Sequence, residues 1–173
     1  MTRPFRLAAL TLAAALAFQA QADTAPNDAQ IAAIVVTANQ VDVDAGKLAA
    51  GKTQSATVKA FALQMVTDHS GVNKMAVDLV TRLKVKPQDN PTAQSLQKGG
   101  DDNLAKLRTL SGAAFDKAYV DHEVAYHVAV LDALDKVLIP SASNAELKAL
   151  LVKVRPAIDA HLQHAKHLQA ELK

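Results

Sequence analysis

The sequence predicts an all-α protein, and three observations lead to this fold class. Apolar residues recur at alternating intervals of three and four residues over four long segments, which places them on one face of a helix. Alanine and leucine are abundant, whereas runs of β-branched residues are short. Most glycine and proline residues lie between the periodic segments, where they interrupt helices.

The first two predicted helices form a hairpin with a short turn. The first begins after Asn27, whose spacing to Gln30 matches a capping box, and extends from about Asp28 to Ala50. Gly51 follows at the position that favours a left-handed residue after a helix. The second helix is expected from about Ser55 to Lys84.

A long connection then separates this hairpin from a second one. Pro87 and Pro91 prevent a continuous helix, and a shorter amphipathic helix is expected from about Thr92 to Leu110. Its Gly99-Gly100 pair is expected to kink or split it. A connection of about 25 residues can cross a bundle lengthwise, which favours a one-crossover, ferritin-like four-helix bundle over an up-down-up-down arrangement.

The second hairpin contains the third and fourth long helices. The third follows the break at Ser111-Gly112 and ends at Pro140. The segment from Ser143 to Glu146 matches another capping box and opens the fourth helix, which continues to near the C-terminus. Pro156 lies inside this helix and is expected to kink it.

The N-terminal segment predicts export. Arg3 and Arg6 precede an apolar run that ends at about Phe18, and Ala20-Gln21-Ala22 follows as a cleavage motif. Residues 1–22 are therefore expected to be a signal peptide, and residues 23–173 one helical-bundle domain in the periplasm or outside the cell. No later stretch is long and apolar enough to span a membrane. The lack of cysteine excludes a lipoprotein anchor, disulfides and thiolate metal ligands.

The charge of the expected mature chain argues against nucleic-acid binding. Without Arg3 and Arg6, the basic residues fall from 19 to 17 and equal the 17 acidic residues. Lysines are scattered among acids and aromatic residues make up 3% of the sequence, so a stacking platform is lacking. Neither a serine or cysteine nucleophile motif nor a glycine-rich phosphate loop appears, so we assign no catalytic residue.

Each of the four long helices carries one polar, metal-capable side chain within its apolar stripe. These residues are Asp42, His69, His127 and His161. Burying a polar group without a partner is costly, so the four are expected to meet one another or a ligand. Three imidazoles and a carboxylate suit zinc, iron, manganese or copper, and Met65, one turn before His69, favours copper.

The heights of these residues along their helices predict two adjacent pairs rather than one four-ligand cage. With a lengthwise crossover and a rise of about 1.5 Å per residue, Asp42 shares a level with His161. His69 and His127 share a second level about 8 Å away. The His69–His127 pair is therefore the expected metal site.

Two acidic residues near these histidines are further candidate ligands. Glu123 lies one turn before His127 and, like Met65, would support the His69–His127 pair. Asp68 directly precedes His69 and points about 100° away from it, which departs from the Glu-x-x-His spacing of di-iron bundles. Ferroxidase or iron-storage chemistry is therefore not expected.

A structural role for the polar residues is the alternative interpretation. The histidines would then hydrogen-bond to Asp42, Tyr119 or Tyr126 and fix the register of the helices without a metal. Three other histidines are expected to be half-exposed or on the surface: His122, His164 and His167.

Three sequence blocks stand out: Met65-Val66-x-Asp68-His69, Leu110-Ser111-Gly112-x-x-Phe115-Asp116 and Pro156-x-x-x-x-His161-Leu162. They resemble a bacterial envelope family that is described as a domain of unknown function. Its members are often labelled predicted outer-membrane proteins, and the resemblance implies a ferritin-like fold. The family pattern maps onto Asp42, Met65, Asp68, His69, His127 and His161. Glu123 stands where the family tends to have methionine, and Tyr126 where it tends to have an acid.

The expected function is that of an exported cell-envelope helical bundle that binds a transition metal through its core histidines and carboxylates. Copper, zinc and iron are the candidate ions. The alternative is a non-catalytic structural or interaction module of the envelope. The sequence predicts no oligomeric state.

Overall fold

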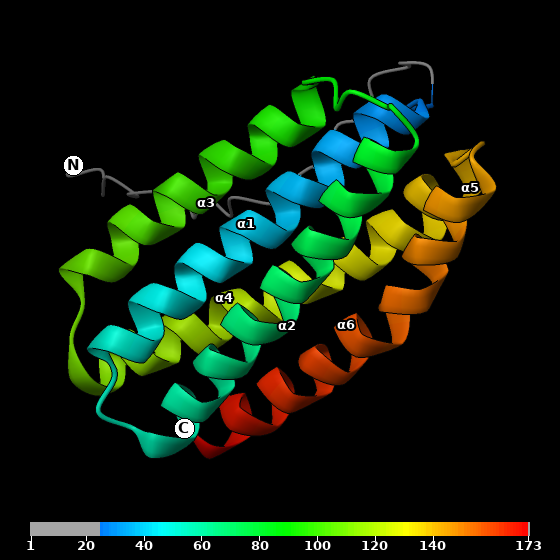
Figure 1. Ribbon diagram of the computed structural model, residues 1–173. Coiled ribbons are helices and arrows are strands. Elements are labelled where there is room, and N and C mark those ends of the chain that lie inside the picture. Colours follow the sequence, from blue (N-terminus) through cyan, green and yellow to red (C-terminus); the bar gives the residue numbers. More distant parts are fainter. Residues whose placement is uncertain (1–24, 173) are drawn as a thin grey trace, which may run out of the picture.

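The computed structural model of the chain describes residues 25–172, which form a bundle of long helices (Figure 1). The elements are α1 (Asp28–Lys52), α2 (Ala56–Arg82), α3 (Pro91–Thr109), α4 (Gly112–Ala133), the π-helical segment η1 (Leu134–Leu138), α5 (Ile139–Ser141) and α6 (Ala145–Glu171). The described residues contain no strand, so the all-α class is confirmed. The predicted signal peptide and its cleavage site lie outside the described residues.

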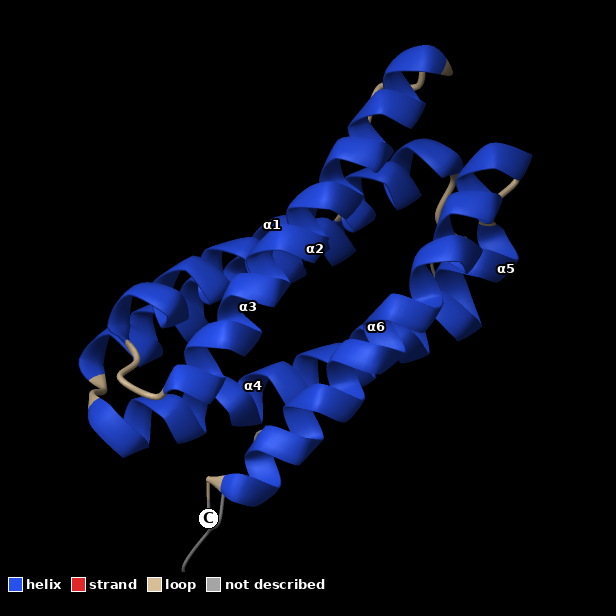
Figure 2. Cartoon of the chain, turned by 60° about the horizontal axis from the view of Figure 1, so that its bottom comes forward, coloured by secondary structure: helices blue, strands red, loops and turns tan. Residues whose placement is uncertain are grey.

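The chain forms two helical hairpins that are joined by α3. α1 and α2 run antiparallel, α3 returns the chain lengthwise beside α1, and α4 and α6 form a second antiparallel pair (Figures 1 and 2). The main packing contacts are those of α1 with α2 and α3, of α4 with α6, and of α2 with α6. Between residues 25 and 172, no helix combines the length and apolar character that crossing a membrane requires.

Glycine at two positions allows neighbouring helices to approach α1 closely. A Cβ atom at Gly100 of α3 would lie 2.7 Å from a methyl carbon of Val41. A Cβ atom at Gly46 of α1 would lie 2.9 Å from the backbone oxygen of Ala62 in α2. α3 is continuous through Gly99 and Gly100, so the predicted split at this pair is wrong. Gly100 instead provides space for packing against α1.

Alanine substitutions at Gly46 and Gly51 should have opposite effects on the free energy of unfolding. Gly51→Ala places its methyl group in open space. It should raise the free energy of unfolding by about 0.5–1 kcal/mol, because alanine has a higher helix propensity than glycine. Gly46→Ala should destabilise by about 1–3 kcal/mol because its methyl group meets the α2 backbone. Urea denaturation measures both changes. Equal stabilisation by the two substitutions would contradict the close approach of α1 and α2.

Several helix boundaries differ from the prediction. Gly51 lies inside the last turn of α1, and the extended Thr53 ends that helix. Pro140 does not end the third long helix, because the chain passes through η1 into α5 with Pro140 in its first turn. Asn144, rather than Ser143, caps α6 and accepts bonds of 2.9 and 3.1 Å from backbone N–H groups. Two other predicted features are confirmed: the Asn27–Gln30 capping box and Pro156 within α6.

The buried side chains form two apolar clusters with a polar layer between them. The first cluster includes Ile31, Val35, Val72, Leu134 and Leu151. The second includes Ala45, Phe61, Met65, Phe115 and Leu168. On each of α1, α2, α4 and α6, the polar residue of the apolar stripe lies between residues of the two clusters. The fold therefore brings four polar side chains to one level.

Candidate metal centre

The polar layer consists of Asp42 from α1, His69 from α2, His127 from α4 and His161 from α6. All four are at most 4% exposed. The centroids of the three imidazole rings lie 5.2 to 5.6 Å from one another. Asp42 Oδ2 lies 3.1 Å from His69 Nε2 and 3.5 Å from His127 Nε2. The expectation that these side chains are buried and meet one another is confirmed.

The four side chains form one compact cluster, so the predicted separation into two pairs is wrong. That prediction used only the heights of the residues along the helix axes, whereas helical side chains lean toward the N-terminus of their own helix. α1 and α6 run in one direction and α2 and α4 in the opposite one (Figure 1). The side chains of Asp42 and His161 therefore lean toward the level of His69 and His127. The side chains of His69 and His127 lean toward the level of Asp42 and His161, so the predicted separation of about 8 Å between the two levels is closed.

Two of the histidine rings are held by hydrogen bonds to their Nδ1 atoms. His69 Nδ1 lies 2.8 Å from Asn39 Oδ1, and Asn39 Nδ2 donates to the backbone oxygen of Val35 at 2.8 Å. The Asn39 oxygen therefore accepts, and Nδ1 of His69 carries the proton. His127 Nδ1 donates to the backbone oxygen of Glu123 at 2.9 Å.

The third ring, that of His161, is held by Asp68 of α2. His161 Nε2 lies 2.8 Å from Asp68 Oδ2, and the Asp68 side chain is 42% exposed. Asp68 therefore contacts the outer nitrogen of the ring instead of joining the buried cluster. Carboxylates in this position commonly fix the orientation and tautomer of metal-binding histidines.

The opposite nitrogens of the three rings remain available to a ligand. These atoms, His69 Nε2, His127 Nε2 and His161 Nδ1, are buried and have no hydrogen-bond partner among residues 25–172. Each ring offers a nitrogen within 4.8 Å of one from each of the other two. Imidazole nitrogens bind ions at about 2.0–2.1 Å, so an ion among the three rings would require small movements of these side chains.

Burial determines the protonation of the cluster. It lowers the pKa of His69 to about 3 and that of His127 to about 4, since it disfavours the charged imidazole. It raises the pKa of Asp42 to about 7 and that of Glu123 well above its ordinary value. Asp42 and Glu123 each have a carboxyl oxygen within 4.8 Å of the other's, and burial raises the pKa of both, so this pair holds a proton near neutral pH. His69 and His127 are then neutral and carry free lone pairs.

Glu123 and Tyr119 extend the polar layer along α4. Asp42, Glu123 and His127 each offer a ligand atom within 4.8 Å of the other two. Tyr119 is fully buried, and its hydroxyl has no hydrogen-bond partner in the described part of the chain. Burial, followed by the nearby Glu123 and Asp42, raises the pKa of Tyr119 well above its ordinary value. Met65, by contrast, packs in the second apolar cluster.

Sequence reasoning missed Asn39 and misassigned Tyr126. Asn39 lies three residues before Asp42 on the same helical face, so its place in the apolar stripe was an available signal. In the structural alternative, Tyr126 was one of three residues to which the histidines would hydrogen-bond. Its hydroxyl instead donates to the backbone oxygen of Ala38 at 2.8 Å, and its ring meets His127 edge-on with centroids 6.0 Å apart.

The other three histidines of the sequence lie outside the polar layer. His122 is half-buried, as expected, and stacks on Tyr126 with ring centroids 5.7 Å apart. His164 is half-buried and lies 3.2 Å from the side-chain oxygen of Gln64. His167 is exposed and pairs with Glu171 at 3.2 Å, which confirms its surface position.

Comparison with known proteins identifies one family. The model of "Domain of unknown function (DUF4142)" matches residues 13–168, a range that contains every residue of the polar layer. No curated protein and no solved structure gives a match. The comparisons therefore supply no activity or ligand, and the function has to be argued from the site.

Proposed function

We propose that this chain, which belongs to the DUF4142 family, binds one divalent transition-metal ion in the core of its helical bundle. His69, His127 and His161 would supply three imidazole nitrogens, and Asp42 a carboxylate oxygen. The proposal depends on one observation: three buried imidazole rings meet, and each keeps a nitrogen that has no hydrogen-bond partner in the described structure.

The geometry supports a metal site better than a network that only fixes helix register. A register-fixing network stabilises a core when its buried polar groups are satisfied. In this cluster the outer nitrogens of the rings have partners, whereas the inner ones form no hydrogen bond, and Asp42 Oδ2 lies 3.1 and 3.5 Å from those of His69 and His127. Each buried group left without a partner costs about 1–3 kcal/mol, and a single ion would satisfy all three nitrogens.

The donor set indicates a first-row transition metal. Three nitrogens and one oxygen suit zinc, iron(II) or copper(II), and the sequence offers no thiolate. Met65 is not needed in this set, since it packs with Phe61 and Phe115 in the second apolar cluster. A cavity of about 40 Å³ borders Asp42, His69 and His127. Because it has room for little more than a water molecule, we favour a binding or stabilising role over catalysis.

We further propose that the protein is exported and that its bundle is ferritin-like. The charged and apolar leader supports export, and two hairpins joined by the lengthwise α3 support the ferritin-like arrangement. Cell fractionation should recover the protein in the periplasmic fraction with a new N-terminus near Asp23. Recovery as a membrane protein that resists high salt and alkaline extraction would contradict this location.

Metal analysis of protein purified without a histidine tag tests the proposed site. After dialysis against zinc, iron(II) or copper(II), about one equivalent of at least one of these ions should remain bound. His127→Ala should retain less than about a tenth of that amount. His167→Ala removes an exposed histidine of α6 and is the matched control. Absence of bound metal in the unsubstituted protein, or equal metal content in both variants, would overturn the proposal.

Asp68→Ala should weaken metal binding without removing a ligand. His161 would lose the carboxylate that orients its ring, and the loss of such a partner typically lowers metal affinity about 10–100-fold. Asp78→Ala is the control, because Asp78 lies on the same helix and is exposed in a pair with Lys74. Competition with a chromophoric chelator measures the affinities. Equal affinities would show that Asp68 does not position His161.

A further inference from the structure

An ion bound by the three histidines and Asp42 Oδ2 would leave three buried oxygen atoms unsatisfied. These atoms are Asp42 Oδ1, Glu123 Oε2 and the Tyr119 hydroxyl, and none has a hydrogen-bond partner among residues 25–172. All three residues are at most 1% exposed. Burying a polar atom without a partner is costly, so these oxygens indicate a second ligand beside the histidines.

The helices bring the three oxygen-bearing side chains together. Tyr119 precedes Glu123 by one turn of α4, so both lie on the same face of this helix. Asp42 of α1 and Glu123 each offer a carboxyl oxygen within 4.8 Å of the other's, a separation that one ion can bridge. Burial, and then the negative charges of Glu123 and Asp42, raise the pKa of Tyr119 well above its ordinary value, so its hydroxyl lies within electrostatic range of both carboxylates.

The donor atoms of this group suit a harder ion than the histidines do. Two carboxylates and a phenol offer only oxygen, which hard divalent ions such as manganese(II) prefer, whereas imidazoles favour zinc, copper and iron. Two carboxylates this close repel each other unless a cation or a proton lies between them. Asp42 can serve both sites, because Oδ2 lies 3.1 Å from His69 Nε2 while Oδ1 is a separate buried donor.

We propose that a second divalent ion, of the manganese(II) class, binds between Asp42, Glu123 and Tyr119. The proposal rests on the proposed histidine site, because Asp42 would bridge the two ions. Ions in two-metal sites are typically about 3.5–4 Å apart, a distance that one shared carboxylate spans. Manganese(II) is at the weak end of the affinity order of divalent metals. Dialysis that leaves the histidine-bound ion in place would therefore remove the second ion.

Manganese titration of protein that is already loaded with its histidine-bound ion tests the second site. Zinc, iron(II) and copper(II) all bind more tightly than manganese(II), so manganese should not displace them from the histidines. The electron paramagnetic resonance signal of free manganese(II) should show one further equivalent bound, with a Kd below about 1 mM. Anomalous diffraction at the manganese edge should locate this ion between Asp42 and Glu123.

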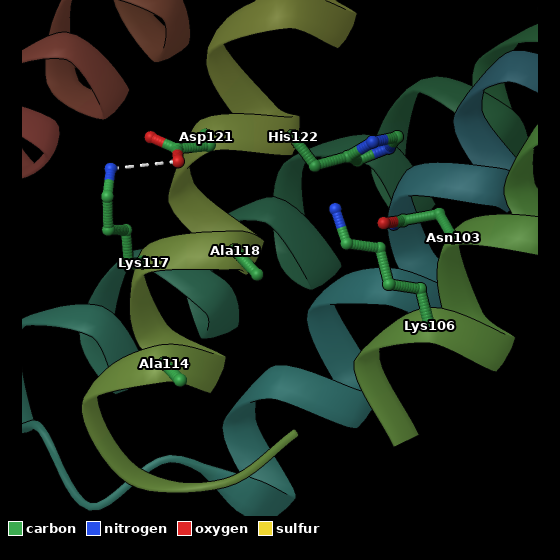
Figure 3. A pocket seen from close by; sticks show the side chains of 7 residues that line it. All are labelled: Asn103, Lys106, Ala114, Lys117, Ala118, Asp121 and His122. Carbon is green, nitrogen blue, oxygen red and sulfur yellow. Dashed lines mark hydrogen bonds and ion pairs between the residues drawn. The ribbon is translucent and has the colours of Figure 1, made fainter. Parts of the chain in front are cut away.

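Two substitutions on α4 and a matched control identify the ligands. Glu123→Gln should weaken manganese binding at least tenfold, about 1.4 kcal/mol, while the histidine-bound ion stays at one equivalent. Tyr119→Phe should weaken manganese binding about two- to tenfold, because one oxygen is lost. Asp121→Asn should leave it unchanged. Asp121 lies on the same helix, but its carboxylate lines a pocket between α3 and α4 and pairs with Lys117 at 3.0 Å (Figure 3).

The outcomes separate this proposal from that of the histidine site. If the histidine-bound ion is retained but no manganese binds, only the second site is overturned, and buried water would have to satisfy the three oxygens. Manganese affinity that both Glu123→Gln and Tyr119→Phe leave unchanged would also overturn the second site, as would an anomalous peak elsewhere. If the histidines retain no ion, both proposals fail.

Discussion

Removing the bound metal with a chelator should lower the melting temperature of the protein by roughly 10 °C. An ion that binds only the folded state stabilises it by about 4 kcal/mol at 1,000 times its Kd. For a domain of this size, each kcal/mol shifts the melting temperature by about 2–4 °C. Thermal denaturation followed by circular dichroism, first with excess zinc and then with a chelator, measures the difference.

His127→Ala provides the decisive comparison for this effect. It removes one inner nitrogen from the cluster, so zinc and chelator should give the same melting temperature in this variant. His167→Ala, which alters only an exposed ion pair, should keep the full response. If the unsubstituted protein melts at the same temperature with zinc and with chelator, the polar layer is a structural network and the metal proposal is wrong.

The sequence was sufficient to identify the residues of the polar layer. Asp42, His69, His127 and His161 each interrupt an apolar stripe, and such interruptions are visible because helical periodicity is regular. The long connection likewise indicated a lengthwise segment between the two hairpins, since its length exceeds what a turn requires. Both inferences depend on local sequence patterns, which determine which face of a helix is buried.

The arrangement within the layer could not be predicted in the same way. The single cluster depends on the direction in which each side chain leans, which matters once antiparallel helices are packed. The role of Gly100 depends on Val41, a residue distant in sequence whose proximity appears only in the folded chain. Asp68 points away from His69 on its own helix, yet it holds His161 of another helix. These are tertiary relations that periodicity does not contain.

The affinity for zinc should rise about tenfold per pH unit between pH 5.5 and about 7 and level off above that. Burial raises the pKa of Asp42 to about 7, so below this pH zinc must displace one proton from its carboxyl group. His69 and His127 add nothing to the slope, because their pKa values of about 3 and 4 keep them neutral throughout this range. Calorimetry with a competing chelator at four pH values measures the slope.

The titration of Asp42 should also affect the stability of the metal-free protein, but in the opposite direction to its effect on zinc affinity. Folded Asp42 keeps a proton that the unfolded chain releases above its ordinary pKa of 3.8, so this group makes stability fall as pH rises to about 7. His69 and His127 make stability rise with pH up to their ordinary pKa of 6.5. Between their lowered pKa values and 6.5, these histidines bind a proton only in the unfolded chain. Above pH 6.5 only the fall in stability caused by Asp42 remains, and bound zinc should abolish this fall.

Asp42→Asn separates these effects. An amide cannot release a proton, so zinc affinity in this variant should be weaker at pH 7 and nearly independent of pH between 5.5 and 7. The metal-free variant should also lose the part of the decline in stability above pH 6.5 that Asp42 causes. A tenfold slope that persists in Asp42→Asn would assign the displaced proton to Glu123, whose pKa is also raised by burial. A flat affinity in the unsubstituted protein would place Asp42 outside the ligand set, with the ion held by the three histidines alone.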